Sequence, residues 1–326
     1  MRVDELRTML EKYEKAVLKE IIVSLYKMIP KNRKEDSALD ELLLNFAHEK
    51  AKTSNKKDKS KDFKLLKAEI EQLMDYADMQ YYLAPNNYVR KEQRSKWRFE
   101  VKRLIKELLS IGGENSEEAG QLLADIYAML CYACAYYVFR TEAPFSAVGY
   151  QQPELLRLVL GKIFYSGFSL VAIKRAVFLT LDSDVDRETL NVELMFVLVD
   201  ILQTPDAKEM ALSQCVAFQK EYDSYQASKN VFKHSTYGSE YRRKEHSNYS
   251  VDQYLLLKFS LDEYDDGIDY FWKHYIEKNK EITLYCLLRF INNETLWIRE
   301  YEKAVANGIK PRDYLQKEYA KLKAES

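Results

Sequence analysis

The sequence predicts an all-α fold, and three observations support this prediction. Only 9 Gly and 6 Pro occur in 326 residues, which are too few turn-forming residues for a many-stranded β fold. Nearly every stretch carries apolar residues at the spacing of one helix face. The content of 47% apolar and 31% charged residues is typical of a folded chain rather than a disordered one. We therefore expect helices joined by short connections.

Residues 1–112 are expected to form an N-terminal helical region. Four helices are expected in it, over 4–29, 37–46, 62–83 and 90–111. Pro30 ends the apolar stripe of the first helix, and Gly112-Gly113 ends the last one. A lysine-rich linker is expected near 50–61, and its composition is typical of a flexible tether.

The next helix, over 115–139, is apolar nearly all round and is expected to be the most buried element. Asn115 and Glu118 have the spacing of a capping box at its start. Its apolar stretch has the length of a membrane span, but the tyrosines in its middle favour a buried core helix. Redox Cys-x-x-Cys pairs lie at a helix N-terminus, and zinc sites usually combine two such pairs. We therefore interpret Cys131 and Cys134, which lie mid-helix, as core residues, and we expect no metal and no cofactor.

Residues 113–326 are expected to form stacked antiparallel helical hairpins, an α-solenoid of the HEAT/TPR-like kind. From residue 152 on, helix starts recur about every 16 to 18 residues, so that a helix pair recurs about every 34 to 36 residues. The expected starts are Pro153, Ser169, Asp186 and Thr204-Pro205, and then Ser250, Ser260, Asn279, Asn293 and Pro311. Arrays of this kind usually present a concave face for binding.

The strongest surface signal is a series of cations in the helix expected over 90–111. They recur every four residues along one flank, and none has an acidic residue three or four positions away: Arg94, Arg98, Lys102 and Lys106. Like charges at this spacing repel by about a few tenths of a kcal/mol per pair. Acids on a neighbouring helix, solvent or a phosphate-bearing ligand could offset this repulsion. A solvated or internally paired flank stays open as the alternative.

The second candidate is an irregular loop expected over 223–250, which is polar and lacks a sustained apolar period. Its aromatic and basic side chains suit base stacking and phosphate contact: Tyr237, Tyr241, Arg242, Arg243 and His246. His234 and His246 could also act as an acid–base pair in RNA cleavage. The Arg-to-His spacing of helical HEPN ribonucleases is not present, however. An ordinary exposed loop is the alternative interpretation.

An acidic cluster between 182 and 193 has the spacing of an EF-hand calcium loop. Arg187 replaces the glycine that such a loop needs, and a helical apolar pattern through Leu190, Leu194, Val197 and Ile201 follows directly. We interpret Asp186 as a helix N-cap instead.

The sequence favours a binding or adaptor protein with a protein partner over an enzyme, because no catalytic motif is found. The alternative is a nucleic-acid-binding protein, with or without RNA cleavage, that uses the basic flank and the 223–250 loop. The first ten residues lack the apolar run of a signal peptide, and four scattered cysteines are typical of a reducing compartment. A cytoplasmic location and no membrane partner are therefore expected, and the oligomeric state stays open.

Overall fold

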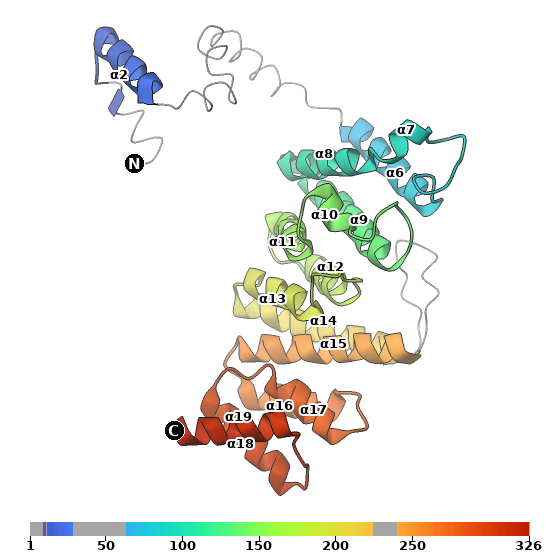
Figure 1. Ribbon diagram of the computed structural model, residues 1–326, viewed down its shortest axis with the longest axis vertical. Coiled ribbons are helices and arrows are strands. Elements are labelled where there is room, and N and C mark those ends of the chain that lie inside the picture. Colours follow the sequence, from blue (N-terminus) through green and yellow to red (C-terminus); the bar gives the residue numbers. More distant parts are fainter. Residues whose placement is uncertain (1–8, 11, 29–62, 224–239, 326) are drawn as a thin grey trace. The chain divides into compact units, whose positions relative to one another are not determined.

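The computed structural model describes residues 9–10, 12–28, 63–223 and 240–325, and within these ranges every regular element is a helix (Figure 1). The all-α prediction is therefore confirmed for the described residues. The chain divides into two units, residues 1–63 and 64–326. This division lies well before residue 112, where the sequence analysis ended the N-terminal region, because helices after residue 63 pack with the second unit.

The described part of the first unit contains helix α2 (Lys15–Met28), which lies inside the helix predicted over 4–29. None of its residues is buried, so its apolar stripe is largely exposed. The helix predicted over 37–46 and the lysine-rich linker near 50–61 lie outside the described residues.

The second unit begins with α6 (Phe63–Asp78), α7 (Lys91–Arg94) and α8 (Trp97–Ser110). The single helix predicted over 90–111 is thus interrupted at residues 95–96. On one side of the break, Trp97 stacks on Phe139 with ring centroids 3.8 Å apart. On the other side, the Arg94 guanidinium donates hydrogen bonds to the carbonyl oxygens of Val89 and Asn86. Each side of the break is therefore held by contacts of its own.

Helix α9 (Ser116–Ala135) is the central element of this region and packs against α8, α11 and the short helix α10 (Pro144–Val148). Twelve of its twenty residues are buried, which confirms the predicted core helix. The capping box predicted at the start of this helix is not formed. Asn115 makes no side-chain cap, and Glu118 pairs with Lys67 at 2.6 Å instead. Among the helices described here, none has the length and apolar character needed to cross a membrane.

Four further helices follow: α11 (Gln152–Ile163), α12 (Leu170–Leu181), α13 (Asn191–Ile201) and α14 (Pro205–Asp223). Ser169 and Thr204 accept hydrogen bonds from main-chain amides at the starts of α12 and α14, as predicted. The predicted start at Asp186 is wrong. The buried Gln152 side chain accepts from the Asp186 amide and donates to the Asp184 carbonyl, so it holds this segment as a loop. The starts at 152, 170, 191 and 205 are consequently spaced by 18, 21 and 14 residues, less evenly than expected.

The last helices are α15 (Glu240–Phe259), α16 (Tyr264–His274), α17 (Lys280–Leu288), α18 (Glu294–Ala306) and α19 (Asp313–Glu325). Asn279 and Asn293 cap α17 and α18 through their side chains, as predicted. Ser250 starts no helix, because it lies inside α15, and α16 begins at Tyr264 after an unpredicted turn. From α8 to α19, most helices pack against the next helix or the next but one in the chain (Figure 1).

Candidate functional site

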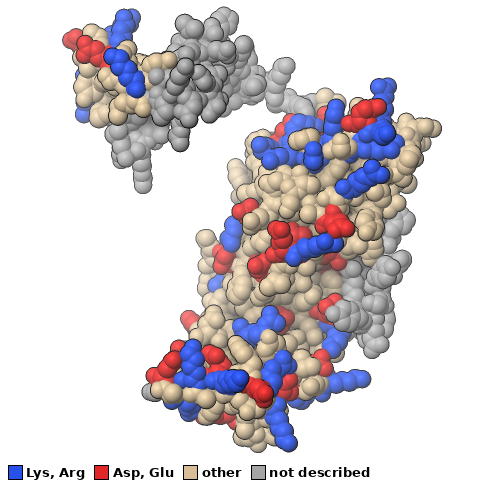
Figure 2. Space-filling model, in the orientation of Figure 1, with Lys and Arg blue, Asp and Glu red and all other residues tan. Residues whose placement is uncertain are grey.

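The basic flank predicted from the sequence lies on two helices rather than one. Arg94 belongs to α7, is half-buried and holds the preceding loop through the two carbonyl contacts described above. Arg98, Lys102 and Lys106 lie on α8, four residues apart. Figure 2 shows Lys and Arg side chains gathered over the α7–α8 region of the second unit. The candidate surface thus consists of the three α8 cations, with Arg94 in a structural position beside them.

No ion pair joins these three α8 cations to a carboxylate within the described part of the chain. Arg103 on the same helix shows the contrast, because it pairs with Glu69 at 2.8 Å and with Glu107 at 3.1 Å. Arg98 and Lys106 are exposed, and Lys102 is half-buried with its Nζ close to Gly149 at the end of α10. Within the described residues, ion pairing inside the protein therefore applies to Arg103 and not to Arg98, Lys102 or Lys106.

An exposed aromatic ring lies among these cations. Phe99 is 62% exposed, and the Arg98 guanidinium lies 4.8 Å from its ring centroid. The buried stripe of α8 comprises Trp97, Val101, Leu104, Ile105 and Leu108. At 100° per residue Phe99 points away from this stripe, on the solvent side next to Lys102 and Lys106.

The second predicted candidate, the 223–250 loop, is only partly a loop. Tyr237 and His234 lie outside the described residues, while residues 240–250 form the first half of α15. Tyr241, Arg242 and Arg243 lie in the first turn of this helix. Lys244 pairs with Glu277 at 2.7 Å.

His246 is buried in the core and is not on the surface as expected. It is 5% exposed, and its Nδ1 lies 2.9 Å from the Leu181 carbonyl oxygen and 3.5 Å from Asp182 Oδ1. A histidine with these surroundings ties α15 to the end of α12 and cannot reach a macromolecular ligand. Within the described residues, α8 packs against α9 and α10, whereas α15 packs against α12, α13, α14 and α16, so the described part of the second segment does not pack on α8.

The Cys-x-x-Cys pair has the character of core residues. Burial raises the pKa of the Cys131 thiol to about 12 and also raises the pKa of Cys134. The Cys134 Sγ lies 3.4 Å from the Leu130 carbonyl oxygen and donates to it. Among the described residues, no group of three or more His, Cys, Asp or Glu side chains could hold a metal ion. The acidic residues between 182 and 193, all of which are described, do not form such a group.

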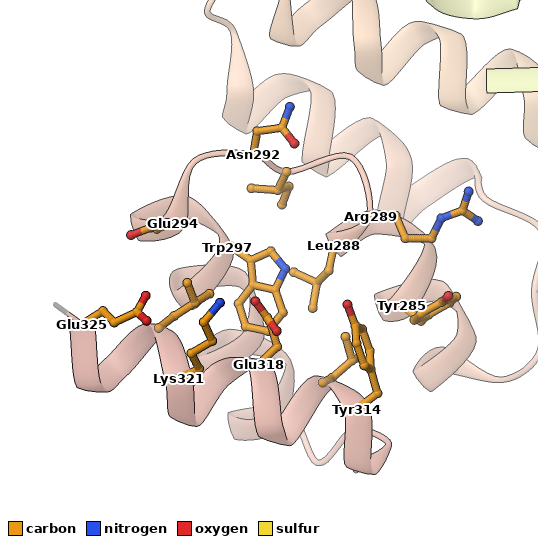
Figure 3. A pocket seen from close by; sticks show the side chains of 13 residues that line it. Tyr285, Leu288, Arg289, Asn292, Glu294, Trp297, Tyr314, Glu318, Lys321 and Glu325 are labelled. Carbon is orange, nitrogen blue, oxygen red and sulfur yellow. The ribbon is translucent and has the colours of Figure 1, made fainter. Parts of the chain in front are cut away.

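The structure also contains a groove that the sequence analysis missed. It lies between α17, α18 and α19 and has a volume of about 460 Å³ (Figure 3). Its buried lining is apolar: Leu288, Ile291, Trp297, Leu315 and Leu322. Its rim carries Tyr314, which is 61% exposed, and charged groups of both signs.

The charges on the groove rim are unevenly distributed. In Figure 3, Glu294 and Glu325 lie at one end and Arg289 lies at the other, beside Tyr285. Glu318 and Lys321 project from α19 between the two ends. The groove thus joins an apolar floor to a polar rim, which is the usual composition of a ligand-binding pocket. Nothing local in the sequence distinguishes these residues from ordinary core and surface positions, because they come from three helices.

No protein-family model matches the chain, and neither a curated protein nor a solved structure matches it. Function therefore has to follow from the chemistry of the α8 surface and of the groove.

Proposed function

We propose that this protein is a non-enzymatic binding or adaptor protein of the cytoplasm that engages a protein partner through the α17–α19 groove. In this proposal residues 64–326 form a stacked-hairpin array of the α-solenoid kind. The packing of most helices on the next helix or the next but one supports that arrangement. The four cysteines without a disulfide support a reducing compartment.

The single observation that carries the proposal is the residue composition of the groove. Trp, Tyr and Arg contribute most of the binding energy at protein interfaces, and Trp297, Tyr314 and Arg289 all line this groove. Leu288 and Leu322 complete an apolar floor that a partner's side chains could cover. The charged rim around this floor corresponds to the polar rim of interfaces between proteins.

The test is a comparison of two exposed tyrosines. Tyr314 lies on the groove rim, and Tyr165, which is 64% exposed, lies in the turn after α11. We expect Tyr314→Ala to weaken partner binding by about thirtyfold, the effect of losing one strong interface residue. Tyr165→Ala should leave binding unchanged. Partners are captured from cells with the full chain after nuclease treatment, and retention is measured by quantitative mass spectrometry.

A photo-reactive amino acid then locates the contact. When it replaces Lys321 on the rim, we expect a covalent adduct with the same partner that depends on Tyr314. When it replaces Lys303, an exposed residue of α18 outside the groove lining, no adduct should form. Equal retention by the two alanine variants, or equal adducts from both positions, would contradict the groove as the binding site.

A further inference from the structure

Helix α8 presents a second surface that the groove does not involve. Phe99 and Lys106 lie on its solvent side, opposite the buried stripe described above, and Arg98 and the half-buried Lys102 continue along the flank next to them. With a rise of about 1.5 Å per residue, the three cations form a line about 12 Å long. Residues 90–107 contain 8 Lys or Arg and 3 Glu, so the surroundings of this line are also basic.

Two features of this surface are unexplained by folding. Arg98, Lys102 and Lys106 repel one another along the helix and gain no carboxylate partner within the described residues. Phe99 exposes a large apolar ring to water although α8 already has a complete buried stripe. An external ligand that is anionic and has flat apolar faces would satisfy both features at once.

We propose that this α8 surface binds single-stranded nucleic acid. Arg98, Lys102 and Lys106 contact successive backbone phosphates, and an unpaired base stacks on Phe99. Sequence-tolerant binding of single strands combines a line of cations with an aromatic stacking platform. The exposed ring favours a single strand over a duplex, because a paired base offers no free face. It also favours nucleic acid over an acidic protein, whose carboxylates would use the cations but leave the ring uncovered.

The test is fluorescence anisotropy of the full chain with labelled 12-nucleotide RNA and DNA, the matching duplex, and a polyglutamate peptide of equal charge. Lys102→Gln with Lys106→Gln removes two cations, and Lys15→Gln with Lys19→Gln removes two exposed lysines at the same spacing on α2. Phe99→Ser removes the ring. Each variant is first compared with the wild type in its unfolding transition, so that only folded proteins are used.

We expect single strands to bind more tightly than the duplex or the peptide. Losing two phosphate contacts should reduce the slope of log K against log salt by about 1.4. The affinity loss between 50 and 200 mM salt should therefore be about sevenfold smaller for the α8 double variant. The α2 control should keep the wild-type slope. Phe99→Ser should lower affinity by at least about fivefold and leave the slope unchanged.

Three outcomes would overturn the proposal. The first is that no oligonucleotide binds at 50 mM salt. The second is that the α8 and α2 double variants lose the same slope, which would mean that overall charge rather than this surface attracts the ligand. The third is that polyglutamate binds as tightly as single strands with the same dependence on Lys102 and Lys106, which would assign the surface to an acidic protein. None of these outcomes bears on the α17–α19 groove, so the two proposals are tested separately.

Discussion

Asp252 is expected to make the stability of this protein fall as pH rises towards 8. It lies on α15, which packs against α16, and its Oδ1 is buried without a hydrogen-bond partner among the described residues. Burial raises the pKa of this carboxyl group to about 8, although the positive charge of Arg289 opposes the rise. Replacing the residue by Asn removes the ionisable group at nearly constant shape.

The size and sign of the effect follow from proton linkage. Below about pH 4 the carboxyl group is protonated in both the folded and the unfolded chain. Between about pH 4 and pH 8 only the folded chain keeps this proton, so the free energy of unfolding falls by up to about 1.4 kcal/mol per pH unit. Above about pH 8 both states are ionised and the loss is constant. The accumulated loss at pH 8 is therefore at most about 5 kcal/mol.

The assay is urea unfolding of the wild type and of Asp252→Asn at pH 5, 6, 7 and 8. The buried amide of the variant costs about 1 to 3 kcal/mol at every pH. We therefore expect the variant to gain steadily on the wild type from pH 5 to pH 8 and to be the more stable protein at pH 8, by about 2 to 4 kcal/mol. Asp269→Asn, which changes an exposed carboxylate on α16, is the control. Parallel profiles for the wild type and Asp252→Asn would refute the reasoning.

Three further predictions concern packing, capping and thiol chemistry, and thermal unfolding tests the first two. Gly267→Ala should destabilise the protein by about 1 to 3 kcal/mol, because a Cβ there would lie 2.9 Å from the Lys258 Cβ. Gly161→Ala, in a helix and with open space around it, should instead stabilise it by about 0.5 to 1 kcal/mol; equal signs would contradict the packing argument. Ser169→Ala should cost about 1 kcal/mol through loss of the α12 N-cap, and Ser169→Asp should restore it. Cys131 should resist iodoacetamide at pH 8 in the folded chain, because burial raises its pKa to about 12; rapid alkylation detected by mass spectrometry would contradict its burial.

The sequence was informative where local chemistry decides the structure. The burial of the apolar helix around Cys131 was predictable, because a helix that is apolar nearly all round is stable only in the core of the protein. Ser169 and Asn293 were predictable as caps because their side chains accept hydrogen bonds from main-chain amides only three residues further along the chain. Asp186 and Ser250 looked equally like caps and are not. Contacts from distant residues decide at both positions, since Gln152 holds the loop around Asp186 and Ser250 is buried inside α15.

The candidate surfaces divide in the same way. The spacing of Arg98, Lys102 and Lys106 was visible in the sequence, because one helix determines it. Their lack of carboxylate partners within the described residues was not visible, because it depends on which acids the neighbouring helices bring close. The groove could not be predicted at all, since Trp297 and Tyr314 meet only through the packing of α18 and α19.

The two proposed surfaces share no helix, and this has a consequence that can be measured. Helix α8, which carries the first surface, packs onto α9 and α10, whereas the groove is formed by α17, α18 and α19 (Figure 1). A ligand on one surface therefore covers no residue of the other. Several helices, each about 10 Å wide, lie between the two sets of exposed charges, and the Debye length at about 0.15 M salt is only about 8 Å. We expect saturation with a single-stranded oligonucleotide to leave the photo-adduct at position 321 unchanged. A loss of that adduct would show that the two ligands compete, and would mean that nucleic acid rather than a protein partner occupies the groove.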